Sequence, residues 1–190
     1  TKKRRKSTPK ANSNFTEDLA PWEETYADSS GKFRTRSKRG NYYFTVFVDA
    51  KTGDKIVICH AKRKHFPVVY FTFINRIGRH PKVLYTDLAP EMSSDDFERY
   101  LLVKGVNHIP VPRVEHHGIG VAEKAIQDLS NMMCSYLTDN NLPGIYWDFV
   151  VEHAALVNSM ITPSITDKSR TIFELVWGVV PNLDLIPPIG

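Results

Sequence analysis

Short segments rich in β-branched and aromatic residues mark the strands of this chain. Five such segments occur, separated by polar or glycine-containing stretches: residues 24–28, 41–49, 55–60, 83–87 and 107–111. The second and third flank the turn sequence Lys51-Thr-Gly-Asp54, so they predict a β-hairpin. The fourth is short and apolar until it ends at Asp87, which is typical of a buried strand with parallel neighbours.

Apolar residues at helical spacing predict helices between and after these strands. The predicted ranges are 65–77, 97–103, 121–138, 145–160 and 171–177. The first fits a helix at least as well as a strand, and its place as the crossover between the hairpin and the next strand favours a helix. Ser93-Ser-Asp-Asp96 has the spacing of a capping box, with Asp in place of Glu, and predicts the start of the second helix.

The order of these elements predicts an α/β fold, a mixed five-stranded sheet flanked by helices. Residues 1–20 contain little to bury and are interpreted as a basic, disordered arm or linker. Residues 21–190 are expected to form one domain with a C-terminal helical extension. No apolar run approaches the roughly 18 residues of a membrane span, so no membrane partner is expected.

Individual residues of three types add expectations about the core. Trp147 and Trp177 lie among apolar residues at helical spacing, so both are expected to pack in the interior. Cys59 and Cys134 follow apolar neighbours, which predicts buried, inert thiols.

Positive charge is concentrated in two places. Residues 1–10 contain six Lys and Arg residues and no acid, and without these six the formal net charge of +4 would become −2. Such a block is typical of a nuclear-import signal or a nucleic-acid-contacting arm, and equally of a solvated linker. The second basic segment, residues 32–40, is either a solvated hairpin loop or a surface for phosphates.

Three acidic residues stand at the ends of predicted elements. Asp28 and Asp87 end strands, and Glu123 begins a helix after a gap of 35 residues from Asp87. Taken singly, each is also explained as a turn-forming Asp or as an acid at a helix N-terminus. In the predicted order all three could meet at one sheet edge, where metal cations would offset their mutual repulsion.

Such a triad suits metal-dependent phosphoryl transfer. Two Mg²⁺ or Mn²⁺ ions, typically about 3.5–4 Å apart, would clamp the attacking and the leaving oxygen of an in-line displacement at a phosphodiester. In this interpretation Asp28 bridges the two ions, while Asp87 and Glu123 each complete one metal site.

Several motifs surround these acids. They are Thr25-Tyr-Ala-Asp28 with Asp49 further on, Tyr85-Thr-Asp87, and Gly118-Ile-Gly-Val-Ala-Glu123-Lys124. Downstream are Leu142-Pro-Gly-Ile-Tyr-Trp147, Ala154-Ala155 followed by Asn158, and Phe173-Glu-Leu-Val-Trp-Gly178 with Pro181. Together they resemble the integrase core of retroviruses and, more closely, of copia-type LTR retrotransposons, over residues 22–190.

The resemblance implies an RNase H-like fold and DNA integration, in which 3′-end processing and strand transfer insert element DNA into a target. It implies double-stranded DNA as the partner, a dimer or higher assembly, the remaining integrase and polyprotein domains, and action in the nucleus after synthesis in the cytoplasm as part of a polyprotein. It also selects Asp28 over Asp49 as the first catalytic acid. The metal ligands are then Asp28, Asp87 and Glu123.

Expected contacts with DNA come from basic residues near these motifs. Lys124 matches a basic position of the family, and it is equally explained as a solvated helix residue. His117, beside His116 in a glycine-containing segment, is expected to face solvent or DNA rather than to bind metal. The basic segment contributes Arg36, Lys38 and Arg39.

Two segments differ from the usual family pattern. Asp87-Leu-Ala-Pro-Glu91 lacks the glycine that commonly follows the second acid, and His116-His117-Gly118 replaces the usual segment before the third. An alternative interpretation is therefore a catalytically inactive, domesticated module that binds nucleic acid or protein. A third is an RNase H-like nuclease that cleaves without joining.

Overall fold

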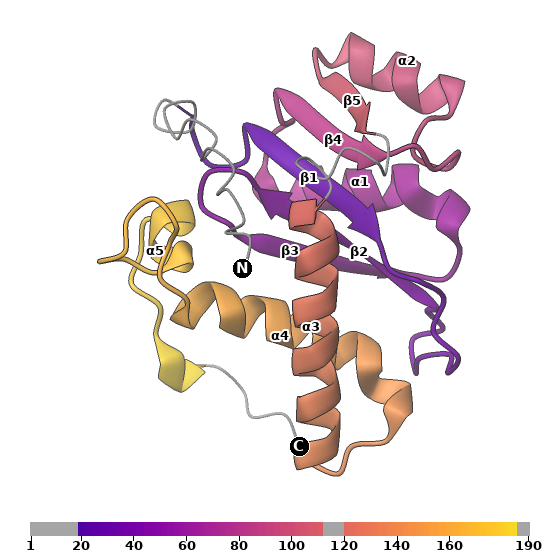
Figure 1. The fold of residues 1–190 in the computed structure, drawn as a ribbon. Coiled ribbons are helices and arrows are strands. Elements are labelled where there is room, and N and C mark those ends of the chain that lie inside the picture. The colour runs from indigo at the N-terminus through magenta and orange to yellow at the C-terminus, as the bar shows by residue number, and fades with distance from the viewer. Residues whose placement is uncertain (1–18, 112–119, 186–190) are drawn as a thin grey trace, which may run out of the picture.

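The computed structural model describes residues 19–111 and 120–185, and within them five strands form one mixed sheet in the order β3-β2-β1-β4-β5 (Figure 1). The strands are β1 (Glu24–Ser29), β2 (Tyr43–Asp49), β3 (Lys55–His60), β4 (Val83–Asp87) and β5 (Asn107–Val111). β1, β2 and β3 pair in antiparallel fashion, whereas β4 pairs in parallel with both β1 and β5. The predicted α/β fold with a mixed five-stranded sheet is confirmed.

Helices cover both faces of the sheet (Figure 1). The helices are α1 (Phe66–Ile77), α2 (Asp95–Val103), α3 (Gly120–Asp139), α4 (Trp147–Ile161) and α5 (Ile172–Trp177), with 3-10 turns at η2 (Arg63–His65), η3 (Gly144–Tyr146) and η4 (Leu183–Leu185). Buried residues of α1 and α2 belong to one core, and those of α3 and α4 belong to the other. None of the helices in the described ranges is long and apolar enough to cross a membrane.

The central strand β2 explains why two cores form. Its residues are buried on both sides, because successive side chains of a strand point to opposite faces. Phe44 and Val46 pack against α3 and α4, whereas Phe47 faces α1 and stacks on Phe73 with ring centroids 4.1 Å apart. The apolar run that predicted this strand therefore fills both layers.

The segment that fitted either a strand or a helix is the helix α1. Pro67 lies at its start, where a missing N–H costs nothing, and Gly78 ends it in the left-handed conformation at φ 75°. Phe66, Val69 and Phe73 are among its buried residues. α1 is the crossover that lets β4 run parallel to β1.

The predicted capping box at Ser93 is wrong. The N-cap of α2 is Ser94, one residue after Ser93, so Phe97 stands where a capping box needs Glu or Gln. Within the described residues no side chain caps this terminus, and the buried Ser93 hydroxyl has no partner there. A complete capping box occurs instead at α5, between Thr171 and Glu174.

The predictions that Trp177 and Cys134 are buried are wrong, whereas those for Trp147 and Cys59 are close to the structure. Trp147 is buried at 2% exposure, but Trp177 is 47% exposed because it ends the short helix α5, which packs mainly on α4. Cys59 is half-buried, and burial raises the pKa of its thiol far above the ordinary value. Cys134 is exposed, since it lies on the face of α3 turned away from the sheet.

Candidate active site at the end of the parallel strands

The parallel pair β1 and β4 positions the first two predicted acids. Tyr26 and Tyr85 are directly opposite each other in the ladder. Asp28 and Asp87 each follow two residues later, so they share one face of the sheet and emerge at the same end of the two strands. The structure thus places Asp28 and Asp87 at the same end of two neighbouring strands.

Tyr26 and Tyr85 lie on the same face of the sheet as Asp28 and Asp87, two residues earlier in each strand. Their rings stack with centroids 4.8 Å apart and an interplanar angle of 23°. Burial raises the pKa of both phenols, which keeps them neutral. Tyr26 packs against the core on the α3 and α4 side, so the acids above it also face that side.

Local backbone contacts orient both carboxylates. The Oδ1 atom of Asp28 accepts a hydrogen bond from the backbone N–H of Ser29 at 2.7 Å. Asp87 is 5% exposed, and its Oδ1 atom accepts from the backbone N–H of Ala89 at 3.1 Å. The turn after β4 therefore sets the orientation of the second acid.

The segment that differs from the family pattern is anchored rather than loose. Met92 is 1% exposed and belongs to the core beneath α1 and α2. Glu91, which precedes it, accepts a hydrogen bond from Arg63 Nη1 at 3.2 Å. These two contacts hold the loop after Asp87 without the usual glycine.

A polar chain that the sequence interpretation missed supports β4 from the opposite face. Thr86 Oγ1 lies 2.8 Å from His108 Nε2, and His108 Nδ1 lies 2.6 Å from Glu98 Oε1. The Thr86 hydroxyl is also within 3.0 Å of the carbonyl oxygen of Asp87. No sequence pattern predicts this series of polar contacts, because its residues come from β4, β5 and α2.

Glu123 occupies the first turn of α3, as predicted, and its side chain is exposed. The helix contacts β1 and β2 and buries Ala122 and Ala125. Among residues 19–111 and 120–185, however, no three His, Cys, Asp or Glu side chains form a group that could hold a metal ion. The structure therefore gathers two of the three acids, with Glu123 on an adjoining helix and outside such a group.

Asp49 differs from Asp28 in its surroundings. It is 1% exposed, and its carboxylate accepts the backbone N–H of Trp22 at 2.7 Å. It also accepts the N–H and the hydroxyl of Thr52, at 2.9 and 2.5 Å. These contacts close the turn between β2 and β3 and tie the start of the domain to it.

The residues predicted to contact DNA fall into separate environments. Lys124 is exposed and forms an ion pair with Asp128 at 2.7 Å. Arg36 and Lys38 are exposed in the connection between β1 and β2, whereas Arg39 forms ion pairs with Asp148 and Glu152. His117 and its neighbour His116 lie outside the described residues.

Comparisons with known proteins agree with this geometry. No protein-family model matches the chain. The chain is 32% identical, over 158 residues and 80% of its length, to a retrovirus-related Pol polyprotein from transposon TNT 1-94 of Nicotiana tabacum. It resembles the HTLV-2 integrase catalytic core domain in complex with magnesium, in a trimeric form, with a TM-score of 0.65 and 21% identity over 83% of this chain and 97% of that one. The chain is thus similar in sequence to part of a retrotransposon Pol polyprotein, and it shares its fold with a retroviral integrase catalytic core.

A second solved structure supports the same fold for this chain. The simian T-cell lymphotropic virus intasome in complex with the PP2A regulatory subunit B56 gamma matches with a TM-score of 0.68 and 21% identity, over 90% of this chain and 58% of that one. The expected RNase H-like fold is thereby confirmed. The chain spans only 12% of the length of the tobacco polyprotein.

Proposed function

We propose that this chain is the catalytic core of a DNA integrase that performs 3′-end processing and strand transfer. The observation that carries the proposal is the parallel register of β1 and β4, which places Asp28 and Asp87 on one face at one strand end. The packing of α3 on β1 supports the proposal, because Glu123 lies in the first turn of that neighbouring helix. Carboxylates on rigid elements are the usual means of holding divalent cations in phosphoryl-transfer sites.

The donor set fits Mg²⁺ or Mn²⁺. Asp28, Asp87 and Glu123 supply only carboxylate oxygens, which hard divalent cations prefer. Two bound ions would supply the charge that activates the attacking oxygen and stabilises the leaving one. The chain itself fixes the orientation of the two strand acids through the backbone N–H groups of Ser29 and Ala89.

The proposed partners follow from the same assignment. They are double-stranded DNA as element ends and target, further copies of the chain, and the remaining domains of an integrase-containing polyprotein. The relative is a Pol polyprotein, and the similar structures include a trimeric form and an intasome, which supports these partners. Action in the nucleus belongs to the same proposal.

A strand-transfer assay tests the proposal. The chain, in its full-length context, is incubated with Mg²⁺ or Mn²⁺, an oligonucleotide carrying an element end and a target plasmid. Glu123→Gln is expected to abolish joined product with an unchanged circular dichroism spectrum. Asp139→Asn, which alters an exposed acid at the other end of the same helix, is the matched control and should keep joining. Unchanged joining by Glu123→Gln would remove this residue from the mechanism.

A second candidate is an inactive module that binds DNA. The observation that favours it is that no metal-holding group of three acids forms within the described ranges. Titration calorimetry separates the two candidates, because an integrase core should bind Mn²⁺ and Asp87→Asn should weaken that binding. DNA binding without any metal binding would support the inactive module, and cleavage without joining would indicate a nuclease.

A further inference from the structure

The connection between β1 and β2, residues 30–42, continues this antiparallel pair of strands beyond the sheet (Figure 1). Backbone N–H groups bond across it from Ser30 to Phe44 at 2.8 Å, from Phe33 to Tyr42 at 2.9 Å and from Ser37 to Asn41 at 3.0 Å. It contains no acidic residue, and its cations are Lys32, Arg34, Arg36, Lys38 and Arg39. We refer to residues 30–42 as the basic arm, which is distinct from the basic N-terminal residues 1–20.

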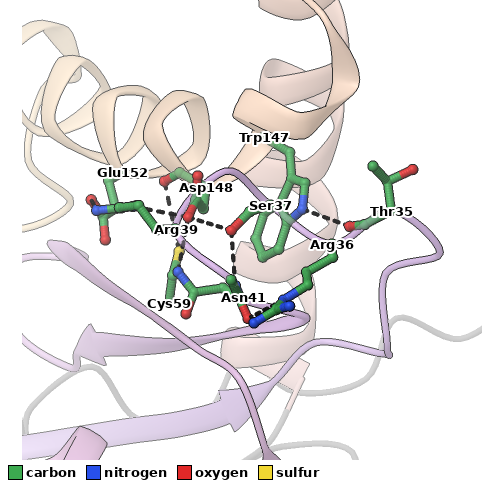
Figure 2. Close-up of polar contacts among 10 residues, drawn as sticks. Thr35, Arg36, Ser37, Arg39, Asn41, Cys59, Trp147, Asp148 and Glu152 are labelled. Atoms are coloured by element: carbon green, nitrogen blue, oxygen red, sulfur yellow. Dashed lines mark hydrogen bonds and ion pairs between the residues drawn. The ribbon is translucent and has the colours of Figure 1, made fainter.

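A buried carboxylate from α4 anchors the tip of this arm (Figure 2). Asp148 is fully buried, and its Oδ2 atom accepts hydrogen bonds from Ser37 Oγ at 2.6 Å, Asn41 Nδ2 at 2.8 Å and Arg39 Nε at 2.9 Å. All these donors belong to the arm. Its other oxygen, Oδ1, is buried without a partner among the described residues. Asp148 lies in the first turn of α4, where the helix dipole also favours a carboxylate.

Apolar and backbone contacts extend the anchor along the arm. The ring of Phe33 stacks on Trp147 with centroids 4.2 Å apart. Trp147 Nε1 donates to the carbonyl oxygen of Thr35 at 3.0 Å (Figure 2). The backbone N–H of Lys38 donates to the carbonyl oxygen of Ile145 at 2.7 Å. The arm is therefore held at its base, its middle and its tip.

The cations of the arm have two different roles. Arg39 is engaged by Asp148, by Glu152 at 2.9 Å and by the ring of Phe149 at 4.2 Å, so it holds the arm on α4. Arg34, Arg36 and Lys38 are exposed. An ordered backbone presents these three cations without the loss of loop entropy that binding would otherwise require.

We call the end of β1 and β4 that carries Asp28 and Asp87 the acid edge. The basic arm starts two residues after Asp28, so it leads directly away from the acid edge. Lys38 is ten residues beyond Asp28, so the two residues can be at most about 35 Å apart, the length of a fully extended chain of ten residues. This is the length of about ten base pairs of duplex DNA at ~3.4 Å each. A duplex whose phosphodiester lies at Asp28 can therefore reach the arm within one helical turn.

We propose that the basic arm is a pre-formed surface for the phosphate backbone of duplex DNA, contacted by Arg34, Arg36 and Lys38, and that Asp148 is the positioning residue that holds it. The inference rests on the proposed function for the identity of the nucleic acid. Its test measures DNA binding without metal, so it is independent of joining.

The first experiment measures the salt dependence of DNA binding by the 190-residue chain. Fluorescence anisotropy with a labelled duplex several helical turns long gives the Kd at a series of salt concentrations from about 50 to 200 mM. The combined variant Arg34→Ala, Arg36→Ala, Lys38→Ala should lower the slope of log Kd against log salt by about 2.7, because each phosphate contact contributes ~0.9. An unchanged slope would overturn the proposal.

A matched control removes the same charge elsewhere. Arg79, Lys82 and Lys104 are exposed and precede β4 and β5, at the sheet end opposite Asp87. Replacing these three with Ala should leave the slope close to that of the unaltered chain. An equal fall in both triple variants would show general charge attraction only and would also overturn the proposal.

The second experiment tests Asp148 through a double-mutant cycle. Loss of an acid ordinarily strengthens DNA binding, but Asp148→Ala is expected to weaken it roughly 3- to 30-fold, which lies within the range of coupling between contacting groups. In the arm triple variant the same substitution should have no weakening effect. Weakening of equal size in both backgrounds would assign Asp148 a purely structural role.

Ser37→Ala provides a milder version if Asp148→Ala does not fold. It removes one donor to Asp148 and an acceptor for the Asn41 N–H, so it should weaken binding in the same direction. A chain that fails to join DNA but shows the arm-dependent slope would support the inference and contradict the proposed function. A chain that joins DNA but whose slope of log Kd against log salt is unchanged in the arm triple variant would support the proposed function and contradict the inference. Tighter binding to RNA than to DNA would overturn the choice of duplex DNA as the partner.

Discussion

The acid edge at β1 and β4 and the anchor at Asp148 use the same chemical group in opposite ways. Asp148 is fully buried, and donors from a single loop bind one of its oxygens. Asp28 and Asp87 sit together on one sheet face at the ends of neighbouring strands, each oriented by a nearby backbone N–H. The difference teaches that the partners around a carboxylate, more than its presence, separate a structural acid from a candidate metal ligand.

The largest expected effect breaks the acid edge without affecting the anchor. Asp87→Asn keeps an acceptor for the Ala89 N–H but removes the charge that a cation needs. Joining should fall by about 10³-fold or more, as for other residues that act as a unit in catalysis. Thermal unfolding followed by circular dichroism should shift little. A large loss of stability with residual joining would contradict the assignment.

Breaking the anchor should give the opposite pattern. Asp148→Ala leaves donors of Ser37, Arg39 and Asn41 without their acceptor, so the free energy of unfolding should fall by about 3 kcal/mol. Urea denaturation measures this change. Asp128→Ala is the control, because its exposed pair with Lys124 is worth less than about 0.5 kcal/mol. Equal effects of the two variants would show that burial of Asp148 adds nothing.

A smaller change isolates one contact of the arm. Trp147→Phe keeps most of the ring that stacks on Phe33 but removes the Nε1–H that donates to Thr35. The free energy of unfolding should fall by about 2 kcal/mol, with about 1 kcal/mol from the lost hydrogen bond and the rest from the smaller ring in a buried position. Hydrogen exchange should show faster exchange in residues 30–42 than in α1. Uniform acceleration across the chain would argue against a local anchor.

The smallest effect concerns pH. Burial lowers the pKa of His60 below its ordinary value of 6.5, and the ring contacts Thr45 Oγ1 at 3.0 Å. Because the folded state disfavours the protonated ring, stability is complete above about pH 6.5 and falls as the pH drops toward the folded pKa. Urea midpoints measured from pH 7.5 to 5 should show this decline, and His60→Gln should flatten it. No difference between the two chains would exclude His60 as the source.

Short-range patterns in the sequence predicted most of the fold. The hairpin β2–β3, the strand ending at Asp87 and the long helix bearing Glu123 all follow from local periodicity and turn residues. The crossover rule then made β4 parallel to its neighbour, so the pairing of the Asp28 and Asp87 strands was also predictable. Side-chain burial was harder, as Trp177 and Cys134 show, because periodicity identifies an apolar face but not the element that covers it.

The sequence by itself determined the order of the elements, the identities and spacing of the three acids and the presence of a basic segment after β1. Only the tertiary structure decided which cation in that segment is paired with acids of α4, because Asp148 lies 109 positions from Arg39 in the chain and meets it across the fold. Tertiary contacts likewise separated Asp49, whose carboxylate is held by Trp22 and Thr52, from Asp28. The physical reason is that the role of a charged group depends on its desolvation and its partners, and long-range packing sets both.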